Sequence, residues 1–588
     1  MDHFPVSIDH LNDPKKMREQ PLNIRQIRKK HWGGTLVFLL IVLAFILALD
    51  HFTQFRIDLT EENRYSLHPF TKDVLETIDT PLEVDILLSG KLPGGMRRFQ
   101  RNIESTLETF NAYSNAPITV RYFNPMEIND KGEKEEYIIY LAEFGINPTN
   151  LFATENGAQT SRLIFPGVII RNATHETGGL LLKGNRGMSP DQILNLSVEN
   201  LEYELINMIR KLTRKKKRAV AMITNHGELQ EDQGYGVVEA LSEDYEVYKV
   251  PLQQAKSVDD LLSFDAVIVA GPRDGYADRE VYLLDQYLMR GGKLLLCVDP
   301  LAVDLAKAGG DGTVAVGFET GLDRMLFKYG VRINKDLVQD MNFGYYPVVA
   351  GEFGDQSQLV PLPWPFYVVA NTMSEHVITK GLDQAMFRMI STIDTVKASG
   401  VQKTPLIYSG RYSRVMSQPV RVAFEDMSQE PDVSLFDQRH LPLVYLLEGD
   451  FSSVFQNRFL PKSFENDPDF AETSDGGAII VTGDGDWLQS VNDRSTGDPV
   501  PLGVVPYAET SFANRELLQN MLKYLVDPNG IMATRSKELK IRPLDKKKVQ
   551  EDKAKWQVLN VALPVVLVLL IGLVKIYFRR RKYGNKVE

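Results

Sequence analysis

AVIVAGPRDGYADREVYLLDQYLMRGGKLLLCVDP, residues 266–300, decides the fold of this chain. It begins with an apolar run (266–271), continues through a segment with apolar residues at helical spacing (279–290) and ends in a second apolar run (293–300). Continuous apolar runs are typical of strands that are buried on both faces. Since a helix between two such strands normally joins them in parallel, the stretch predicts a strand–helix–strand unit of a parallel sheet.

The same pattern continues on both sides of this stretch. The run AVAMIT at 219–224 precedes it, and the run AIIVTGDGDW at 478–487 resumes it after a long, less regular section. We therefore expect an α/β domain at residues 197–530 with a flavodoxin-like, doubly wound parallel sheet. The section at about 301–475 is interpreted as an insertion, after which the late strand rejoins the same sheet.

A smaller α/β unit is predicted upstream, at residues 57–190. Its pattern is strand, helix, strand, then a second helix and a hairpin of two extended runs. The predicted strands are at 82–89, 118–125, 162–171 and 178–183. This βαβ-α-ββ order is the thioredoxin-like arrangement. Because the unit has no C-x-x-C motif, thiol redox chemistry is excluded at the expected place.

Two apolar stretches lie near the ends of the chain, and each is long enough to cross a bilayer. They are at 33–49 and 558–578, and basic clusters flank them in the segments 1–32 and 579–588. Since basic flanks stay on the cytoplasmic side, we predict a bacterial inner-membrane protein with both termini cytoplasmic and the two α/β units periplasmic. Residues 531–556 are interpreted as a membrane-proximal linker.

The composition of the chain limits the classes of molecule that it is expected to bind. The 588-residue chain has a formal net charge of −10, which argues against nucleic acid as the main partner. A basic run at 214–218 is interpreted as a solvated junction between domains, with a binding patch as the alternative.

Cys297 is the only cysteine, so no intrachain disulfide can form. It lies within LLLCVDP without flanking glycines, which indicates a buried core thiol rather than a nucleophile elbow.

Polar residues follow three of the predicted parallel strands, at the strand ends where ligands bind in such sheets. They are Asn225, His226 and Glu228 after the first strand, Asp299 after KLLLCV, and Asp484 and Asp486 after AIIVT. If they converge, the His and carboxylate side chains could bind a metal or perform acid–base chemistry. The same residue types cap helices and shape tight turns, and this structural interpretation is favoured. No metal or cofactor is predicted.

Trp364 is a further candidate for ligand binding. It lies in PLPWPFYVV, residues 361–369, with Tyr345 and Tyr346 upstream. Aromatic side chains in such a stretch can line a carbohydrate or peptide groove by stacking. The alternative is that they pack the inserted section together.

In order and spacing, several phrases make the chain resemble the GldG family, the auxiliary membrane component associated with an ABC-type transporter and with bacterial gliding motility. The phrases are DLTEENRYSLHPFT (58–71), ITNHGE (223–228), GGKLLLCVDP (291–300), VTGDGDW (481–487) and NRELLQNMLKYL (514–525). The middle unit also resembles the flavodoxin-like module of intraflagellar transport proteins, which serves binding and assembly.

The resemblance implies a non-enzymatic subunit that works with a polytopic ABC permease and a separate cytoplasmic ABC ATPase, in gliding or envelope secretion. No G-x-x-x-x-G-K-[ST] occurs, so the chain shows no phosphate loop of its own. Other envelope components and the lipid bilayer are the remaining expected partners. Two alternatives stay open: a tethered periplasmic solute receptor, and an envelope hydrolase that uses His226 and the nearby carboxylates.

Overall fold

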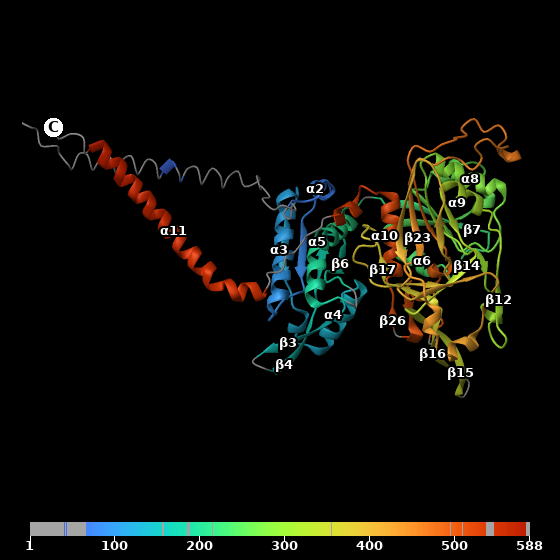
Figure 1. Cartoon of the computed structure of the whole chain (residues 1–588), viewed down its shortest axis with the longest axis horizontal. Helices are drawn as coiled ribbons and strands as arrows, with labels where there is room; N and C mark the ends of the chain where they lie inside the picture. Colours follow the sequence, from blue (N-terminus) through green and yellow to red (C-terminus); the bar gives the residue numbers. More distant parts are fainter. Residues whose placement is uncertain are drawn as a thin grey trace, which may run out of the picture. The chain divides into compact units, whose positions relative to one another are not determined.

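The computed structural model describes residues 40–41, 43, 66–155, 158–184, 188–214, 216–353, 356–493, 496–508, 510–536 and 546–583 (Figure 1). It divides the chain into two units, Met1–Tyr65 and Ser66–Glu588. In the first unit only Leu40, Ile41 and Leu43 are described, and they are helical and exposed. The predicted span at 33–49 therefore lies largely outside the described residues.

Ser66–Glu588 is a mixed α/β structure, and its first sheet has the strand order β2-β1-β5-β6. The strands are β1 (Leu82–Ile86), β2 (Ile118–Tyr122), β5 (Gly167–Arg171) and β6 (Glu176–Leu180). β1 pairs in parallel with β2 across the helix α3 (Gly94–Tyr113), and β5 and β6 form an antiparallel hairpin. Both pairings confirm the sequence prediction.

Helices cover both faces of this sheet. They are α2 (Pro69–Glu76), α3, α4 (Lys131–Glu143) and α5 (Pro190–Thr213). Val168 and Ile170 of β5 face a core shared with α2, α3 and α5, whereas Ile169 faces Leu141 of α4. This alternation follows from the two-residue repeat of a strand. The 3₁₀ helix η9 (Ile531–Ser536) also joins the first core, where it packs against α2 and α5.

The prediction that residues 162–171 form one strand is wrong. The chain instead forms a separate hairpin of β3 (Thr149–Glu155) and β4 (Ala158–Ile164), and then breaks before β5. The break is at Phe165 and Pro166. Because proline has no N–H to donate, the ladder cannot continue through Pro166. The Pro166 carbonyl instead accepts a hydrogen bond from the Leu181 backbone.

The second sheet has eight strands in the order β17-β20-β23-β24-β10-β9-β7-β8. Five of them are parallel neighbours: β7 (Arg218–Thr224), β8 (Tyr245–Pro251), β9 (Ala266–Ala270), β10 (Lys293–Cys297) and β24 (Gly477–Thr482). The late strand β24 pairs with β10, which confirms that it rejoins the sheet.

The prediction that this sheet is wholly parallel is wrong for the three strands that lie beyond β24 in the sheet order. Three strands of the predicted insertion extend the sheet there with antiparallel pairing: β17 (Thr372–Met373), β20 (Val401–Tyr408) and β23 (Pro442–Gly449). Antiparallel neighbours need no crossover helix, so these strands can join from an irregular segment. The section around 301–475 is thus part of the sheet as well as an elaboration of it.

Helices pack on both faces of the large sheet. They are α6 (Tyr235–Ser242) and α10 (Asn514–Val526) on one face, and α7 (Asp259–Leu262), α8 (Asp278–Met289) and α9 (Asp323–Tyr329) on the other. Alternate residues of β10 face the two cores, with Leu295 and Cys297 on the α10 side. Cys297 is fully buried, as predicted, and burial raises the pKa of its thiol.

An additional β-rich region has its own core around Trp364. It contains the long hairpin of β15 (Phe343–Phe353) and β16 (Gln356–Ala370), which Figure 1 shows near the lower edge. The other described strands are β11 (Leu301–Ala302), β12 (Thr313–Gly317), β13 (Val331–Ile333), β14 (Asp336–Asp340), β18 (Ala385–Arg388), β19 (Ile393–Thr395), β21 (Ser413–Ser417), β22 (Val420–Val422), β25 (Val504–Val505) and β26 (Thr510–Ser511). Of these, β13 and β19 contribute to the core on the α8 side of the large sheet.

The last helix, α11 (Lys546–Tyr583), contains the segment Asp552–Arg581. Among the described residues this is the one helix that is long and apolar enough to cross a membrane. The side chains of 552–581 are almost all exposed, and none of the described protein cores includes them. Length, composition and membership of no core make α11 a candidate for membrane association.

Candidate functional site

The polar residues predicted at the strand ends lie at one edge of the large sheet. β7, β9, β10 and β24 are parallel neighbours, so their carboxyl ends meet there. Asn225 and His226 follow β7, Asp299 follows β10, and Asp484 and Asp486 follow β24. We call these residues, together with Glu228, Arg273 and Tyr276, the strand-end cluster.

Arg273 is the centre of this cluster, and the sequence analysis did not single it out. Its Nη1 lies 3.2 Å from Asp299 Oδ2, and its Nη2 lies 2.5 Å from Asp486 Oδ1. Its backbone N–H donates to the carbonyl of His226 at 2.8 Å. Because Arg273 is in the loop that follows β9, the rule that selected the other strand-end residues would also have selected it.

A second part of the cluster is built on Glu228. Its Oε1 accepts a hydrogen bond from the Tyr276 hydroxyl at 2.5 Å, and its Oε2 accepts one from the His226 backbone at 2.6 Å. The His226 ring stacks on Tyr276 with 4.0 Å between ring centroids. Burial and the nearby Glu228 carboxylate raise the pKa of Tyr276 well above its ordinary value, so the phenol stays protonated and keeps donating.

Asn225 shapes the turn that presents these groups. Its backbone φ of 82° is left-handed, as is the φ of 72° at Gly227. Asparagine tolerates this conformation better than most residues, and glycine adopts it freely. The Asn225 carbonyl accepts a hydrogen bond from the Gln253 side chain. The segment ITNHGE therefore makes a tight turn out of β7.

Asp484 and Asp299 brace the loop after β24. Asp484 accepts hydrogen bonds from the backbone of Trp487 at 3.1 Å and of Arg388 at 2.6 Å, and Asp299 accepts one from Gly485 at 2.8 Å. A Cβ on Gly485 would lie 2.3 Å from the Cα of Gly271, so only glycine fits there. The phrase VTGDGDW is thus explained by close packing of two strand-end loops.

The electrostatic state of the cluster follows from its burial. Burial, followed by the Asp486 charge, raises the pKa of Asp299 to about 7, although Arg273 opposes this shift. Burial and the Asp299 charge also raise the pKa of Asp484 well above its ordinary value. At neutral pH the cluster therefore carries less negative charge than three fully ionised aspartates would.

This arrangement stabilises loops and leaves little free for chemistry. The carboxylates of Glu228, Asp299 and Asp484 all accept backbone hydrogen bonds, and the His226 side chain is 2% exposed. Within the described residues, no group of three His, Cys, Asp or Glu side chains could hold a metal ion. The solvent-facing part is the ion pair of Arg273 and Asp486, whose side chains are 38% and 27% exposed.

Trp364 does not join the strand-end cluster. It lies in β16, is 1% exposed, and packs against Tyr346, Tyr367 and Phe424 with ring centroids 4.9–5.7 Å away. These are contacts of the kind that the packing alternative expects. Its indole N–H has no hydrogen-bond partner among the described residues.

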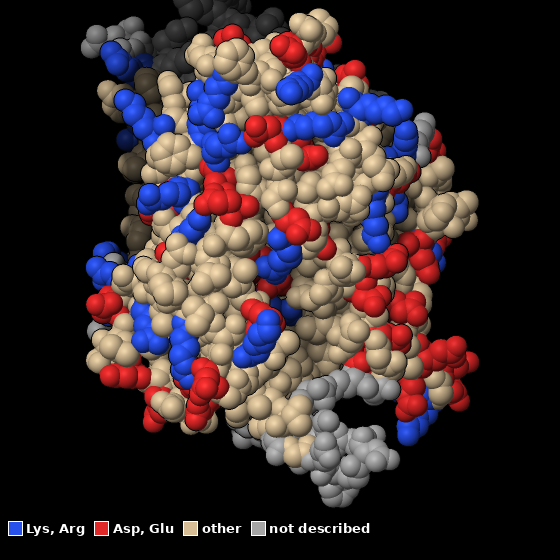
Figure 2. Space-filling view, turned by 90° about the vertical axis from the view of Figure 1, so that its right-hand side faces the viewer, with Lys and Arg blue, Asp and Glu red and all other residues tan. Residues whose placement is uncertain are grey.

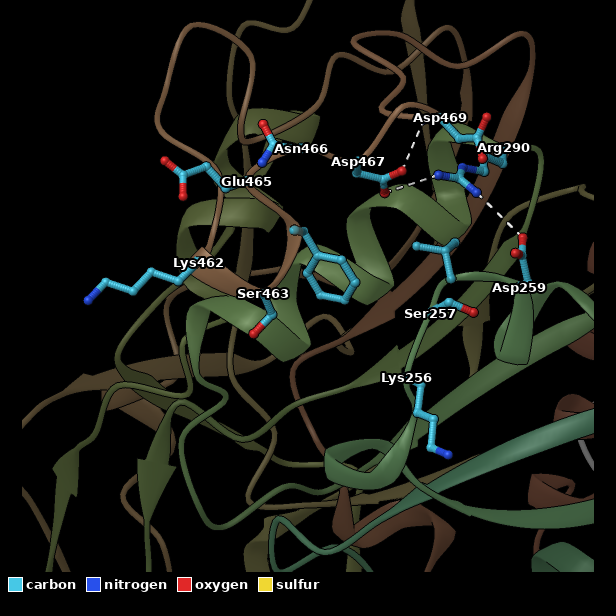
Figure 3. A pocket seen from close by; sticks show the side chains of 12 residues that line it. Lys256, Ser257, Asp259, Arg290, Lys462, Ser463, Glu465, Asn466, Asp467 and Asp469 are labelled. Atoms are coloured by element: carbon cyan, nitrogen blue, oxygen red, sulfur yellow. Dashed lines mark hydrogen bonds and ion pairs between the residues drawn. The ribbon is translucent and has the colours of Figure 1, made fainter.

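A polar cavity of about 410 Å³ lies elsewhere, between α7, the end of α8 and the loop at 462–469 (Figure 3). The sequence analysis did not identify it. Arg290 lies 3.3 Å from Asp467 and 3.6 Å from Asp259, and Tyr282 donates to Asp467 at 2.8 Å. Figure 3 shows Arg290 joined to both Asp467 and Asp259, so these three charges partly neutralise one another.

Comparisons with solved structures give low similarity. The chain resembles the mmIFT52 N-terminal domain at 13% identity and a TM-score of 0.29, covering 52% of this chain and 97% of that one. It resembles a thua-like protein from Bacteroides uniformis ATCC 8492 at 12% identity and a TM-score of 0.25, covering 54% and 95%. At these scores neither likeness defines the fold or the function. No curated protein matches the chain.

Two protein-family models match the sequence. Residues 61–171 match a domain of unknown function, DUF7088. Residues 217–521 match a family described as an ABC-type uncharacterized transport system, whose model denotes an auxiliary component. This second match covers more than half of the 588 residues and includes the large sheet with its strand-end cluster. The chain therefore belongs to the auxiliary family of the ABC-type uncharacterized transport system.

Proposed function

We propose that this protein is a non-catalytic, membrane-anchored auxiliary subunit of an ABC-type transporter complex. The family implies association with such a complex. The observation that carries the non-catalytic part is the strand-end cluster, in which backbone N–H groups and Arg273 already occupy the carboxylates. A hydrolase would need an accessible base, and His226 is buried against Tyr276.

We further propose that energy and passage come from two other proteins, a cytoplasmic ABC ATPase and a polytopic permease. The sequence has no phosphate loop of its own, which supports this division of work. Residues 33–49 and 558–578 would anchor the subunit in the bacterial inner membrane, with the folded units at 57–190 and 197–530 in the periplasm. Bacterial gliding or envelope secretion would be the process served.

The sheet topologies support a more specific description of the two units. We propose that the first is thioredoxin-like, since its order β2-β1-β5-β6 combines a parallel pair with an antiparallel hairpin. The order β8-β7-β9-β10-β24 of the second corresponds to 2-1-3-4-5, the order of flavodoxin-like sheets. Both units would serve as binding surfaces.

A pull-down from native membranes tests the proposed function. The full-length, tagged protein is solubilised in mild detergent, captured, and all retained proteins are identified by mass spectrometry. We expect an ABC ATPase and a polytopic permease. A matched variant, in which an unrelated apolar helix replaces 552–581, shows whether the folded units alone hold the partners. Reproducible absence of both partners, with intact bait, would contradict the proposal.

A further inference from the structure

Cationic side chains converge on a cavity of about 310 Å³ formed by α2, α5, α10 and the start of β7. They come from three places in the sequence: the end of α5, the basic run that follows it, and α10. The five are Arg210, Arg214, Lys216, Arg218 and Lys523. We call this the junction cavity, because it lies where the first α/β unit meets the large sheet.

The junction cavity has a surplus of positive charge. Only Asp244 and Asp527 supply carboxylates to its described lining. Asp244 is shared by Arg210 at 3.4 Å, Arg214 at 3.1 Å and Lys523 at 3.3 Å, and Asp527 lies 3.7 Å from Arg218. Burial alone would raise the pKa of Asp244, but the surrounding cations hold it well below its usual range. Asp244 therefore stays ionised, and cations still outnumber carboxylates.

Some of this donor capacity is unused. Within the described part of the chain, Arg210 Nε is buried without a hydrogen-bond partner, and no carboxylate lies within ion-pair distance of Lys216. On the face shown in Figure 2, by contrast, Lys and Arg side chains are intermingled with Asp and Glu. The junction cavity differs because its cations gather in a recess around too few anions.

The other wall of the junction cavity is apolar. Phe70 and Val74 of α2 line it, together with Ile531 of η9. A ligand would therefore meet cations on one side and hydrocarbon on the other. The volume is at the small end of the usual range for ligand sites, which favours a small molecule or a single headgroup.

We infer that the junction cavity binds a phosphate-bearing anion, either a small phosphoester or the headgroup of an anionic phospholipid. Arginine forks match the geometry of phosphate oxygens, and several guanidinium and ammonium groups together balance its charge. The apolar wall would accept the carbon portion of the ester. This inference does not depend on the transporter partners, because every lining residue belongs to this chain.

Isothermal titration of the full-length protein in detergent tests the inference. The probes are glycerol 3-phosphate and dihexanoyl phosphatidic acid, with glycerol as the phosphate-free control. We expect saturable binding of at least one phosphate probe and none of glycerol. Binding of both assigns the site to free phosphoesters, and binding of the lipid alone assigns it to a headgroup. Binding of neither would overturn the inference.

Variants of the basic run locate the binding. Lys216 and Arg218 lie at the rim, and replacing both (K216Q/R218Q) should weaken binding about tenfold, the effect of losing charge-assisted contacts. Lys217→Gln is the matched control. Its charge change is the same per residue, but Lys217 does not line the junction cavity and donates instead to the Ser242 carbonyl. Equal affinity in K216Q/R218Q and K217Q would overturn the inference.

Discussion

Arg273 joins the loops that follow β7, β9, β10 and β24. It pairs with Asp299 and Asp486, and its backbone bonds to His226. We predict that Arg273→Met lowers the free energy of unfolding by about 1–3 kcal/mol, because Asp299 would remain buried without its counter-charge. The figure is below that of a fully buried pair, since solvent reaches the 38% exposed Arg273 side chain. Chemical denaturation followed by tryptophan fluorescence measures it.

Arg332→Met is the matched control for this prediction. Arg332 lies 2.8 Å from Asp394, but both side chains are more than half exposed. Exposed pairs contribute little, so we expect a change below about 0.5 kcal/mol. Similar losses in the two variants would show that Arg273 has no special structural role.

Asp299 makes stability depend on pH. Its folded-state pKa of about 7 lies above the value of about 3.9 in an unfolded chain. Between these pH values the folded protein binds more protons than the unfolded one. The contribution of Asp299 to the free energy of unfolding is therefore fully present below about pH 4 and is lost as the pH rises to about 7. We predict that Asp299→Asn flattens this fall, which amounts to as much as about 4 kcal/mol. Denaturation curves from pH 4.5 to 8 test it; parallel curves for both proteins would contradict it.

The strand-end cluster was accessible to sequence reasoning because parallel strands align their carboxyl ends. Asn225, Asp299 and Asp484 each follow an apolar run, so their proximity could be predicted. Their bonding could not, because it depends on loop paths: Asp484 caps backbone N–H groups of Arg388 and Trp487, and Arg388 comes from the inserted section. Nothing in the local sequence connects these positions.

Among the elements, η9 is held to α5 and α10 by a buried ionic network. Arg535 stacks on Tyr203 at 4.1 Å and lies 3.3 Å from Glu516 and 3.9 Å from Glu204. Lys183 lies 3.3 Å from the same Glu204. Since the Arg535 side chain is 2% exposed, its charge depends on these partners.

We predict that Arg535→Met destabilises the protein by about 2–3 kcal/mol, because Glu516 loses its nearest ion-pair partner while Lys183 still faces Glu204. Arg535→Lys should cost less, about 1 kcal/mol, since it keeps the charge and loses the planar stacking on Tyr203. Denaturation midpoints of the full-length protein distinguish the two. A larger loss for the lysine variant would contradict this account of the network.

Strand prediction succeeded where burial on both faces leaves a continuous apolar run, as in β9, β10 and β24. It missed β17 and β20 as members of the sheet for physical reasons. β17 has only two residues, and β20 contains Lys403 and Pro405 and lies near the sheet edge, where polar residues are tolerated. The run PLVYLLEG of β23 carries a clear apolar signal, but only short 3₁₀ helices are described between it and the strands with which it pairs, so no crossover α-helix indicates its pairing.

At the scale of the whole molecule, we predict that the protein stays attached to the membrane until both proposed membrane segments are deleted. Deleting 552–581 alone should leave the protein in the membrane fraction, because 33–49 would still span; deleting 33–49 alone should do the same. Removing both should release the folded units. Alkaline carbonate extraction followed by immunoblotting measures the retained fraction. Complete release by the first deletion would show that 33–49 is no anchor.

The packing of η9 against α2 and α5 has a mechanical consequence. α2, the first helix described after residue 66, and η9 at Ile531–Ser536 lie far apart in the sequence but are in contact in the first core. Two segments that are distant in the sequence are thus held together in the first core by the contact between α2 and η9. A pulling force applied at residues 66 and 536 would therefore act directly on the contact between α2 and η9. Because Arg535 of η9 also stacks on Tyr203 of α5, that contact would have to break as well before η9 could leave the first core.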